Sequence, residues 1–113
     1  MSIQTYPRIL QVYVTENGKE PFTEWLTGLK DNRIRARIRR HLDRVQSGNL
    51  GDFKRIGQKL IELRLFFGSG YRIYCCEDGQ NLIILLCGGN KHSQKQDIKK
   101  ADEYLADYMN RKA

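Results

Sequence analysis

The sequence predicts an α+β domain built on a small, mainly antiparallel sheet, with two helices before the core strands and one after them. Three consecutive segments within residues 60–91 have strand patterns and are separated by glycine-containing turns. Residues 31–46 and 93–108 instead repeat apolar residues at helical spacing. Because each helix needs an apolar sheet face to pack against, this combination favours an α+β domain with the order β-α-α-(β)-β-β-β-α.

The core strands are expected at residues 60–67, 71–76 and 82–87. The first alternates between an apolar face with Ile61 and Leu63 and a charged face with Glu62 and Arg64. The turn GSG and the dipeptide DG separate the three strands. The last strand is a continuous apolar run, which is typical of a strand covered on both faces. In the second strand Arg72 interrupts an otherwise apolar segment, so two arginines are expected on one sheet face.

The remaining elements follow from local signals. Residues 8–14 are rich in β-branched and aromatic types and predict a first strand. Pro21 suits the first position of a short helix, and Asp31 is a suitable N-cap for a second helix that ends near Gln46. Residues 52–57 are either a short strand or an irregular connection. The last helix is expected to begin at Ser93, where Gln96 completes a capping-box pattern.

The second helix carries two stripes. One is apolar, and the other, about 125° away on the helical wheel, is made of arginines 33, 37, 40 and 44. This basic stripe is either a solvated helix face or a patch that contacts phosphates or an acidic partner. We take Arg37 and Arg40 as its candidates for RNA binding.

Length and charge bound the functional classes. The 113 residues predict a single domain, residues 1–113, with one modest core. The 20 Lys and Arg against 13 Asp and Glu give a net charge of +7, which favours an anionic partner. Nucleic acid comes first, then an acidic protein, then anionic lipid. A merely basic soluble protein is the alternative that charge alone leaves open.

Several features exclude other classes. The three cysteines, Cys75, Cys76 and Cys87, lie in apolar strands with no CxxC spacing, so core packing is expected rather than a disulfide framework or a zinc site. His41 and His92 have no companions at metal-ligand spacing, so no metal or other cofactor is expected. The N-terminus lacks the apolar segment of a signal peptide, and the longest apolar run is too short to cross a bilayer. A cytoplasmic protein without a membrane partner is therefore expected.

A basic, aromatic-rich set of side chains remains on the core strands and in the segment after them. Its members are Arg64, Tyr71, Arg72, Tyr74, Lys91, His92, Gln94 and Lys95. Metal-free RNA cleavage needs a base for the 2′-hydroxyl, an acid for the leaving 5′-oxygen and cations for the charged transition state. Arg64, Arg72 and Lys91 can supply the cations, and His92 is of the type that exchanges protons near neutral pH. Tyr74 or Lys95 could transfer protons only if their surroundings retuned them.

Tyr71 and Tyr74 can stack on bases, and Gln94 and Lys95 can contact RNA. Each candidate also has a structural alternative. Arg64 can pair with Glu62, the tyrosines can be half-buried sheet residues, and His92 and Lys95 can be solvated. Tyr71 faces away from Arg72 unless the turn twists.

Four segments together resemble the RelE/ParE toxin superfamily, in particular its phage-derived, HigB-like "addiction module killer" proteins: FTEWLTGLKD, DRVQSGNLGDFKRIG, IELRLFFGSGYRIY and LLCGGNKHSQKQDIKKA. The similarity extends roughly from Phe22 to Ala101. It implies a RelE-like fold with helices packed on one face of the sheet. It also implies the toxin of a type II toxin–antitoxin pair, with a small helix-turn-helix antitoxin as partner.

RelE-like members cleave mRNA in the ribosomal A site without a metal, using basic residues on the central strands. The resemblance places Arg64 and Arg72 at the ELR and GYR arginines of the pattern, with Lys91 as the basic residue after the last core strand. No tyrosine follows Lys91 closely, because the first later one is Tyr104. The expected function is a ribosome-dependent mRNA endoribonuclease. The alternatives are a ParE-like toxin that binds DNA gyrase or another protein, and a non-toxic RNA-binding phage accessory protein.

Overall fold

The computed structural model describes residues 6–112. The elements in chain order are β1 (Ile9–Val12), α1 (Pro21–Gly28), α2 (Asn32–Gln46), β2 (Phe53–Ile56), β3 (Leu60–Leu65), β4 (Tyr71–Asp78), β5 (Leu82–Asn90), the 3-10 turn η1 (Lys91–Ser93) and α3 (Gln94–Lys112). This order confirms the predicted one, including the short strand at 53–56. The last core strand is longer than expected, because its pairing with β4 continues to Asn90.

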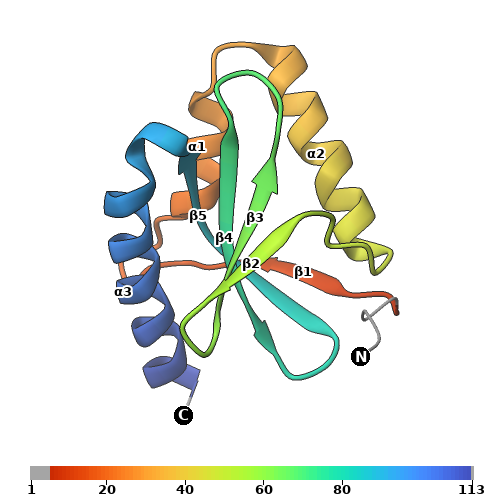
Figure 1. Ribbon diagram of the computed structural model, residues 1–113. Coiled ribbons are helices and arrows are strands. Elements are labelled where there is room, and N and C mark those ends of the chain that lie inside the picture. Colours follow the sequence, from red (N-terminus) through yellow and green to blue (C-terminus); the bar gives the residue numbers. More distant parts are fainter. Residues whose placement is uncertain (1–5, 113) are drawn as a thin grey trace.

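All five strands form one sheet with the spatial order β1-β5-β4-β3-β2 (Figure 1). Strands β2 to β5 are an antiparallel meander, and β1 adds to the outer edge of β5 in parallel. Arg64 in β3 and Arg72 in β4 are direct cross-strand partners. The predicted α+β class and mainly antiparallel sheet are therefore confirmed, and the two arginines share a face as expected.

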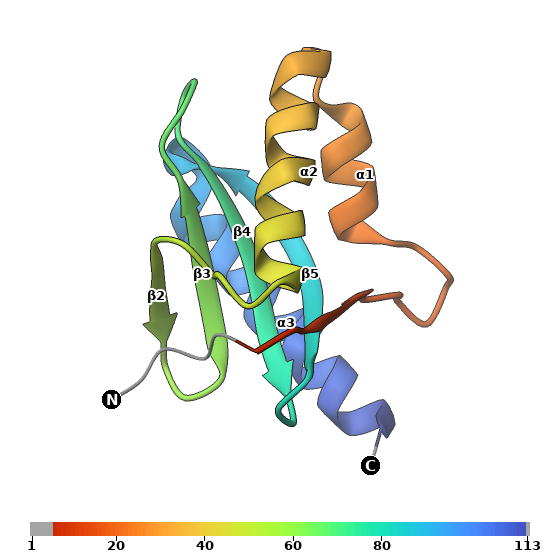
Figure 2. The ribbon, with the colours of Figure 1, turned by 90° about the vertical axis from the view of Figure 1, so that its right-hand side faces the viewer.

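The helices cover both faces of the sheet (Figure 2). Helices α1 and α2 pack on the face that carries Ile61, Leu63 and Ile73. Helix α3 packs on the opposite face, which carries Tyr74, Leu86 and other buried side chains. The expectation that all helices lie on one face is wrong for α3. Helix α3 packs on the second face because β3, β4 and β5 are apolar on both faces, and both faces must be shielded from water.

Side-chain caps fix where the helices begin. The Asp31 carboxylate accepts a 2.9 Å hydrogen bond from the Arg33 backbone N–H, which confirms the predicted N-cap of α2. The capping box before α3 lies three residues earlier than predicted. Asn90 accepts from the backbone N–H of Ser93, and the Ser93 hydroxyl accepts from the Asn90 N–H. The chain therefore turns directly from β5 into η1 and α3.

The cysteines are buried as predicted, with Cys75 in the layer under α1 and α2 and with Cys76 and Cys87 under α3. Within residues 6–112, no helix is both long and apolar enough to cross a membrane.

Candidate functional site

A buried carboxylate organises the polar side chains on the α3 side of the sheet. Glu62 in β3 has no exposed surface. Its Oε1 accepts a hydrogen bond of 3.0 Å from Arg64 Nε. Its Oε2 accepts two hydrogen bonds, one of 2.7 Å from Gln94 Nε2 and one of 3.1 Å from the Tyr74 hydroxyl. Three elements, β3, β4 and α3, therefore meet at one charge whose desolvation is offset by these donors.

The electrostatics keep Glu62 ionised. Burial pushes the pKa of Glu62 up, but the hydrogen bonds from Gln94, Arg64 and Tyr74, with the charge of Arg72, hold it below the ordinary 4.5. Burial and the adjacent Glu62 charge raise the pKa of Tyr74 far above its ordinary value of 10.0. Near neutral pH, Glu62 stays charged and Tyr74 stays protonated. Neither group is suited to exchange a proton with a substrate.

Arg64 and Arg72 face one another across β3 and β4, but their surroundings differ. Arg64 is held by Glu62 through Nε, and 29% of its side chain is exposed. Arg72 has a buried Nε without a hydrogen-bond partner among the described residues. It lines an open hollow of about 330 Å³ together with Lys91 and Phe66. Like charges directly opposite each other repel, so an anion placed between them would be stabilised.

A second open hollow of about 320 Å³ lies between β3 and α2. Its charged and titratable lining residues are Arg37, Arg40, His41, Arg44, Arg64 and the acidic Asp52. Phe66 and Phe67 line both hollows. We call the surface formed by the two hollows the basic face. Its cations are Arg37, Arg40, Arg44, Arg64, Arg72 and Lys91.

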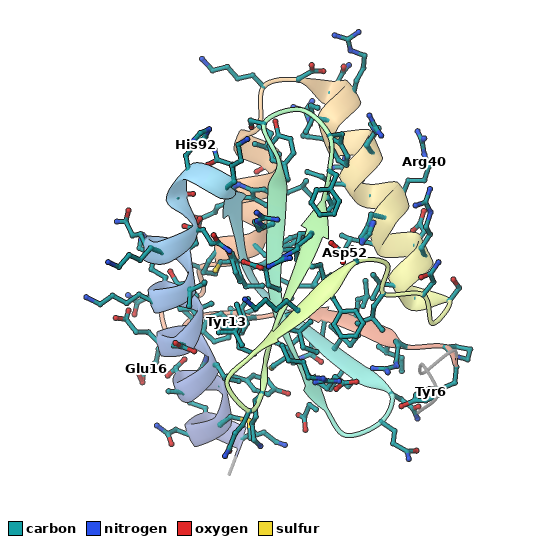
Figure 3. The ribbon with its side chains drawn as sticks, viewed as in Figure 1. Tyr6, Tyr13, Glu16, Arg40, Asp52 and His92 are labelled. Atoms are coloured by element: carbon teal, nitrogen blue, oxygen red, sulfur yellow. The ribbon has the colours of Figure 1, made fainter. Side chains whose placement is uncertain are left out.

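The basic face runs across the end of the β3–β4 hairpin. Figure 3 shows Arg40 on α2 and His92 in η1, just before α3, on opposite sides of that hairpin. His92 is exposed, and its backbone N–H donates to Asn90 Oδ1 at 2.9 Å. Lys91 and Lys95 are also exposed at this end. The predicted cations of the sheet, η1 and α2 therefore lie along one surface.

The tyrosines do not belong to this surface in the way the sequence suggested. Tyr74 is fully buried, so its ring has no face for a base, because the alternation of β4 turns it toward Glu62 under α3. Tyr71 lies on the opposite side of the sheet, where its ring packs 6.4 Å from Trp25 and 5.6 Å from Phe67. The assignment of Tyr74 as a stacking residue is corrected on these grounds, whereas half-buried Tyr71 stays a prediction. Tyr104 packs 5.2 Å from Tyr13, within the core under α3.

Two glycines allow the helices to approach the end of β5 from both sides. A Cβ atom at Gly88 would overlap the Trp25 indole of α1. A Cβ atom at Gly89 would overlap the Asp97 carboxylate of α3. This carboxylate accepts a hydrogen bond of 2.5 Å from the Ser93 hydroxyl. Since Gly89 pairs with Arg72, this close packing also fixes α3 beside the arginine.

Sequence reasoning missed two residues of the site. Glu62 was considered only as a possible partner for Arg64, although a lone carboxylate between apolar residues in a strand is itself a signal of a buried polar cluster. Phe66 falls within the predicted strand at residues 60–67, yet it is 72% exposed. The sequence feature that could have indicated this exposure is the GSG turn close by, because pairing with β4 ends at Leu65.

No set of three or more His, Cys, Asp or Glu side chains within residues 6–112 is arranged to hold a metal ion. The donors of the site are instead cationic, and a guanidinium or ammonium group binds oxyanions rather than metals. The arrangement is therefore suited chemically to a phosphate-bearing ligand.

Comparison with known proteins gives two matches. The family model described as "Phage derived protein Gp49-like (DUF891)" matches residues 24–106. A protein of Haemophilus influenzae, described as an uncharacterized protein, is 45% identical over 80 residues, which cover 71% of this chain and 81% of the relative. The family match includes the Glu62 cluster and every cation of the basic face.

Proposed function

Because the chain belongs to the Gp49-like phage-derived family, a RelE-like toxin family of toxin–antitoxin systems, we propose that it is a toxin that cleaves mRNA on the ribosome. Within that family the proposal assigns it to the HigB-like addiction module killers. The observation that supports this proposal best is the basic face, in which Arg72 and Lys91 line one hollow and Arg64 lines the next. Such a row of cations favours a polyanion over a neutral ligand.

The roles of the side chains follow from their positions. The 2′-hydroxyl of the RNA attacks the adjacent phosphorus, the bond to the 5′-oxygen breaks, and a 2′,3′-cyclic phosphate and a 5′-hydroxyl result. Arg72 and Lys91 stabilise the negative charge that builds on the phosphate oxygens. Arg64 assists with the part of its guanidinium that Glu62 leaves free. Positioned cations of this kind act without a metal or other cofactor.

His92 takes the proton-transfer role, because it is exposed beside Lys91 and no described side chain occupies its imidazole. Glu62 and Tyr74 are unsuited to this role, being buried and locked in one protonation state. One histidine cannot be both base and acid in a single step, so the second transfer falls to water or to a ribosomal group. The open form of both hollows agrees with this dependence on the ribosome.

The remaining predicted contacts extend the RNA site. Arg37 and Arg40 bind the phosphate backbone from α2, and Lys95 adds a cation at the start of α3. Gln94 acts indirectly, since its amide is engaged by Glu62. A small helix-turn-helix antitoxin with an acidic segment would cover the same face and neutralise the toxin. The proposed site of action is the cytoplasm, and the proposed functional unit is one domain, residues 1–113.

Growth assays with transcript mapping test the function. Arg72→Ala and Lys91→Ala should each relieve growth arrest after induction at matched expression. Arg39→Ala, an exposed arginine on α2 outside both hollows, is the matched control and should stay toxic. Arg64→Ala is a poorer probe, because it also removes a partner of the buried Glu62.

Wild-type induction should produce new 5′ ends in mRNA at fixed positions within codons. Growth arrest with induction of DNA damage and no such ends would instead favour a ParE-like inhibitor of gyrase. Harmless induction would favour a non-toxic RNA-binding protein. Full toxicity of both Arg72→Ala and Lys91→Ala would contradict the assigned site.

A further inference from the structure

Phe66 is an aromatic ring held in solvent at the centre of the basic face. It is 72% exposed and directly follows the last residue of β3. It lines both hollows, so cations lie on either side of it. The other large apolar side chains exposed in residues 6–112 are Ile9 and Val14, at and just after β1, and neither lines a hollow of the basic face.

The surroundings of Phe66 are charged rather than apolar. Its neighbour Phe67 also lines both hollows, but its ring is engaged by Arg37, 4.1 Å from the ring centroid, and by Tyr71. Phe66 is therefore not part of a continuous apolar patch of the kind that a protein interface usually buries. A single ring flanked by arginines and a lysine is instead the arrangement that binds single-stranded nucleic acid, in which rings stack on bases and cations contact phosphates.

We propose that Phe66 is the base-stacking platform of this protein. The ring takes a nucleobase of single-stranded RNA. The phosphate on one side of that base lies in the hollow with Arg72 and Lys91, and the phosphate on the other side lies in the hollow with Arg37, Arg40 and Arg44. This inference rests on the proposed function for its substrate class, and it assigns the role that the buried Tyr74 cannot fill.

This placement of one base and two phosphates has two consequences. The hollow beside α2 extends the binding site beyond the reacting phosphate, so the arginines of α2 serve RNA positioning rather than only solubility. Stacking on a ring is tolerant of base identity, since every base has a π face. Phe66 should therefore set how tightly and where the strand lies, with little effect on which base is chosen.

The test uses the purified full chain and a short single-stranded RNA carrying 2-aminopurine. Stacking quenches this fluorescent base, and anisotropy of a dye on the same RNA gives the affinity. Phe66→Leu keeps an apolar side chain without a π face, and should weaken binding about tenfold and abolish the quenching. Phe66→Tyr should restore both. Ile9→Ala, at another exposed apolar site outside both hollows, should change neither.

Cleavage of mRNA on programmed ribosomes separates this inference from the proposed function. If the wild type cleaves mRNA and Phe66→Leu binds, quenches and cleaves equally well, the stacking role is overturned and the nuclease stands. Phe66-dependent quenching without any cleavage would support the stacking role and contradict the nuclease. RNA binding that is unaffected by Phe66→Leu, with weakened binding of the antitoxin, would overturn the inference in favour of a protein contact. Absence of RNA binding by the wild type would also overturn it.

Discussion

The side-chain amide of Gln94 donates a hydrogen bond of 2.7 Å to the buried carboxylate of Glu62, 32 residues earlier in the chain. This contact joins the first residue of α3 to the middle of β3. Because Arg64 donates to the same carboxylate, the position of α3 and the orientation of the arginine depend on one group. Glu62 is therefore a positioning residue that supports the basic face from beneath.

Energetic coupling between Glu62 and Arg64 is the first prediction. Arg64→Met should lower the free energy of unfolding by about 2–3 kcal/mol, because a buried charge loses a donor. Adding Glu62→Leu removes that charge, so the double variant should lose less than the sum of the two single changes, by about 1–3 kcal/mol. Urea denaturation measures all three. Arg39→Met should change stability by less than about 0.5 kcal/mol, and additive losses would refute the coupling.

Acid should destabilise the fold through several carboxylates, of which Glu62 and Glu77 are the partly buried ones. For Glu77, burial pushes the pKa up, but the hydrogen bonds from Arg8 and Arg55 bring it below the ordinary 4.5, as with Glu62. A lowered folded-state pKa gives stability that is complete above the unfolded value and is lost as pH falls through the folded value. The free energy of unfolding should therefore decline below a pH of about 4.5.

Urea denaturation as a function of pH measures this decline. In Glu77→Gln, the protein should be less stable at neutral pH and less sensitive to acid, since one of the groups with a lowered pKa is gone. An acid dependence identical to that of the wild type would exclude Glu77 as a source.

The glycine pair at the end of β5 should resist substitution. Gly88→Ala drives a methyl group into Trp25, and Gly89→Ala drives one into Asp97. Each should cost about 1–3 kcal/mol of stability, because the strand is packed on both sides and cannot relax freely. Gly28→Ala is the control, since its Cβ would meet nothing within 4 Å, and it should be neutral or stabilising. Thermal melts give the comparison, and an unaffected Gly89→Ala would contradict the close approach of α3.

The three thiols should be unreactive in the folded protein. Burial raises the pKa of Cys76 to about 11 and that of Cys87 to about 12, and it raises the pKa of Cys75 still further. Thiolates are the reactive form, so a disulfide reagent at neutral pH should label the chain only as it unfolds. Labelling in urea provides the full signal for comparison. Fast labelling of native protein would mean that the core under α3 opens.

The elements were predictable because their signals are local. The Asp31 cap, the helical spacing of α2 and the alternation of β3 depend on neighbours in sequence, and the structure confirms each. That Arg64 and Arg72 share a face followed from a two-residue period and a hairpin turn. The cations of the candidate site could accordingly be named from sequence.

What could not be predicted depends on contacts between distant segments. Alternation shows that Tyr74 and Glu62 lie on one face, but not that α3 covers that face and buries both. The parallel pairing of β1 with β5 joins segments about seventy residues apart and has no local signal. Phe66 resembles any apolar strand residue until the end of pairing at Leu65 leaves it in solvent.

Cleavage in a reconstituted system tests the central claim most directly. Purified ribosomes carrying a defined mRNA and an empty A site are mixed with the wild type, with Arg72→Ala or with Arg39→Ala. The proposed mechanism predicts that the wild type and Arg39→Ala cut the message in the A site at similar rates, and that Arg72→Ala is slower by about a hundredfold or more, as expected when a transition-state cation is removed. An uncut message with the wild type, or equal cleavage by Arg72→Ala, would contradict it.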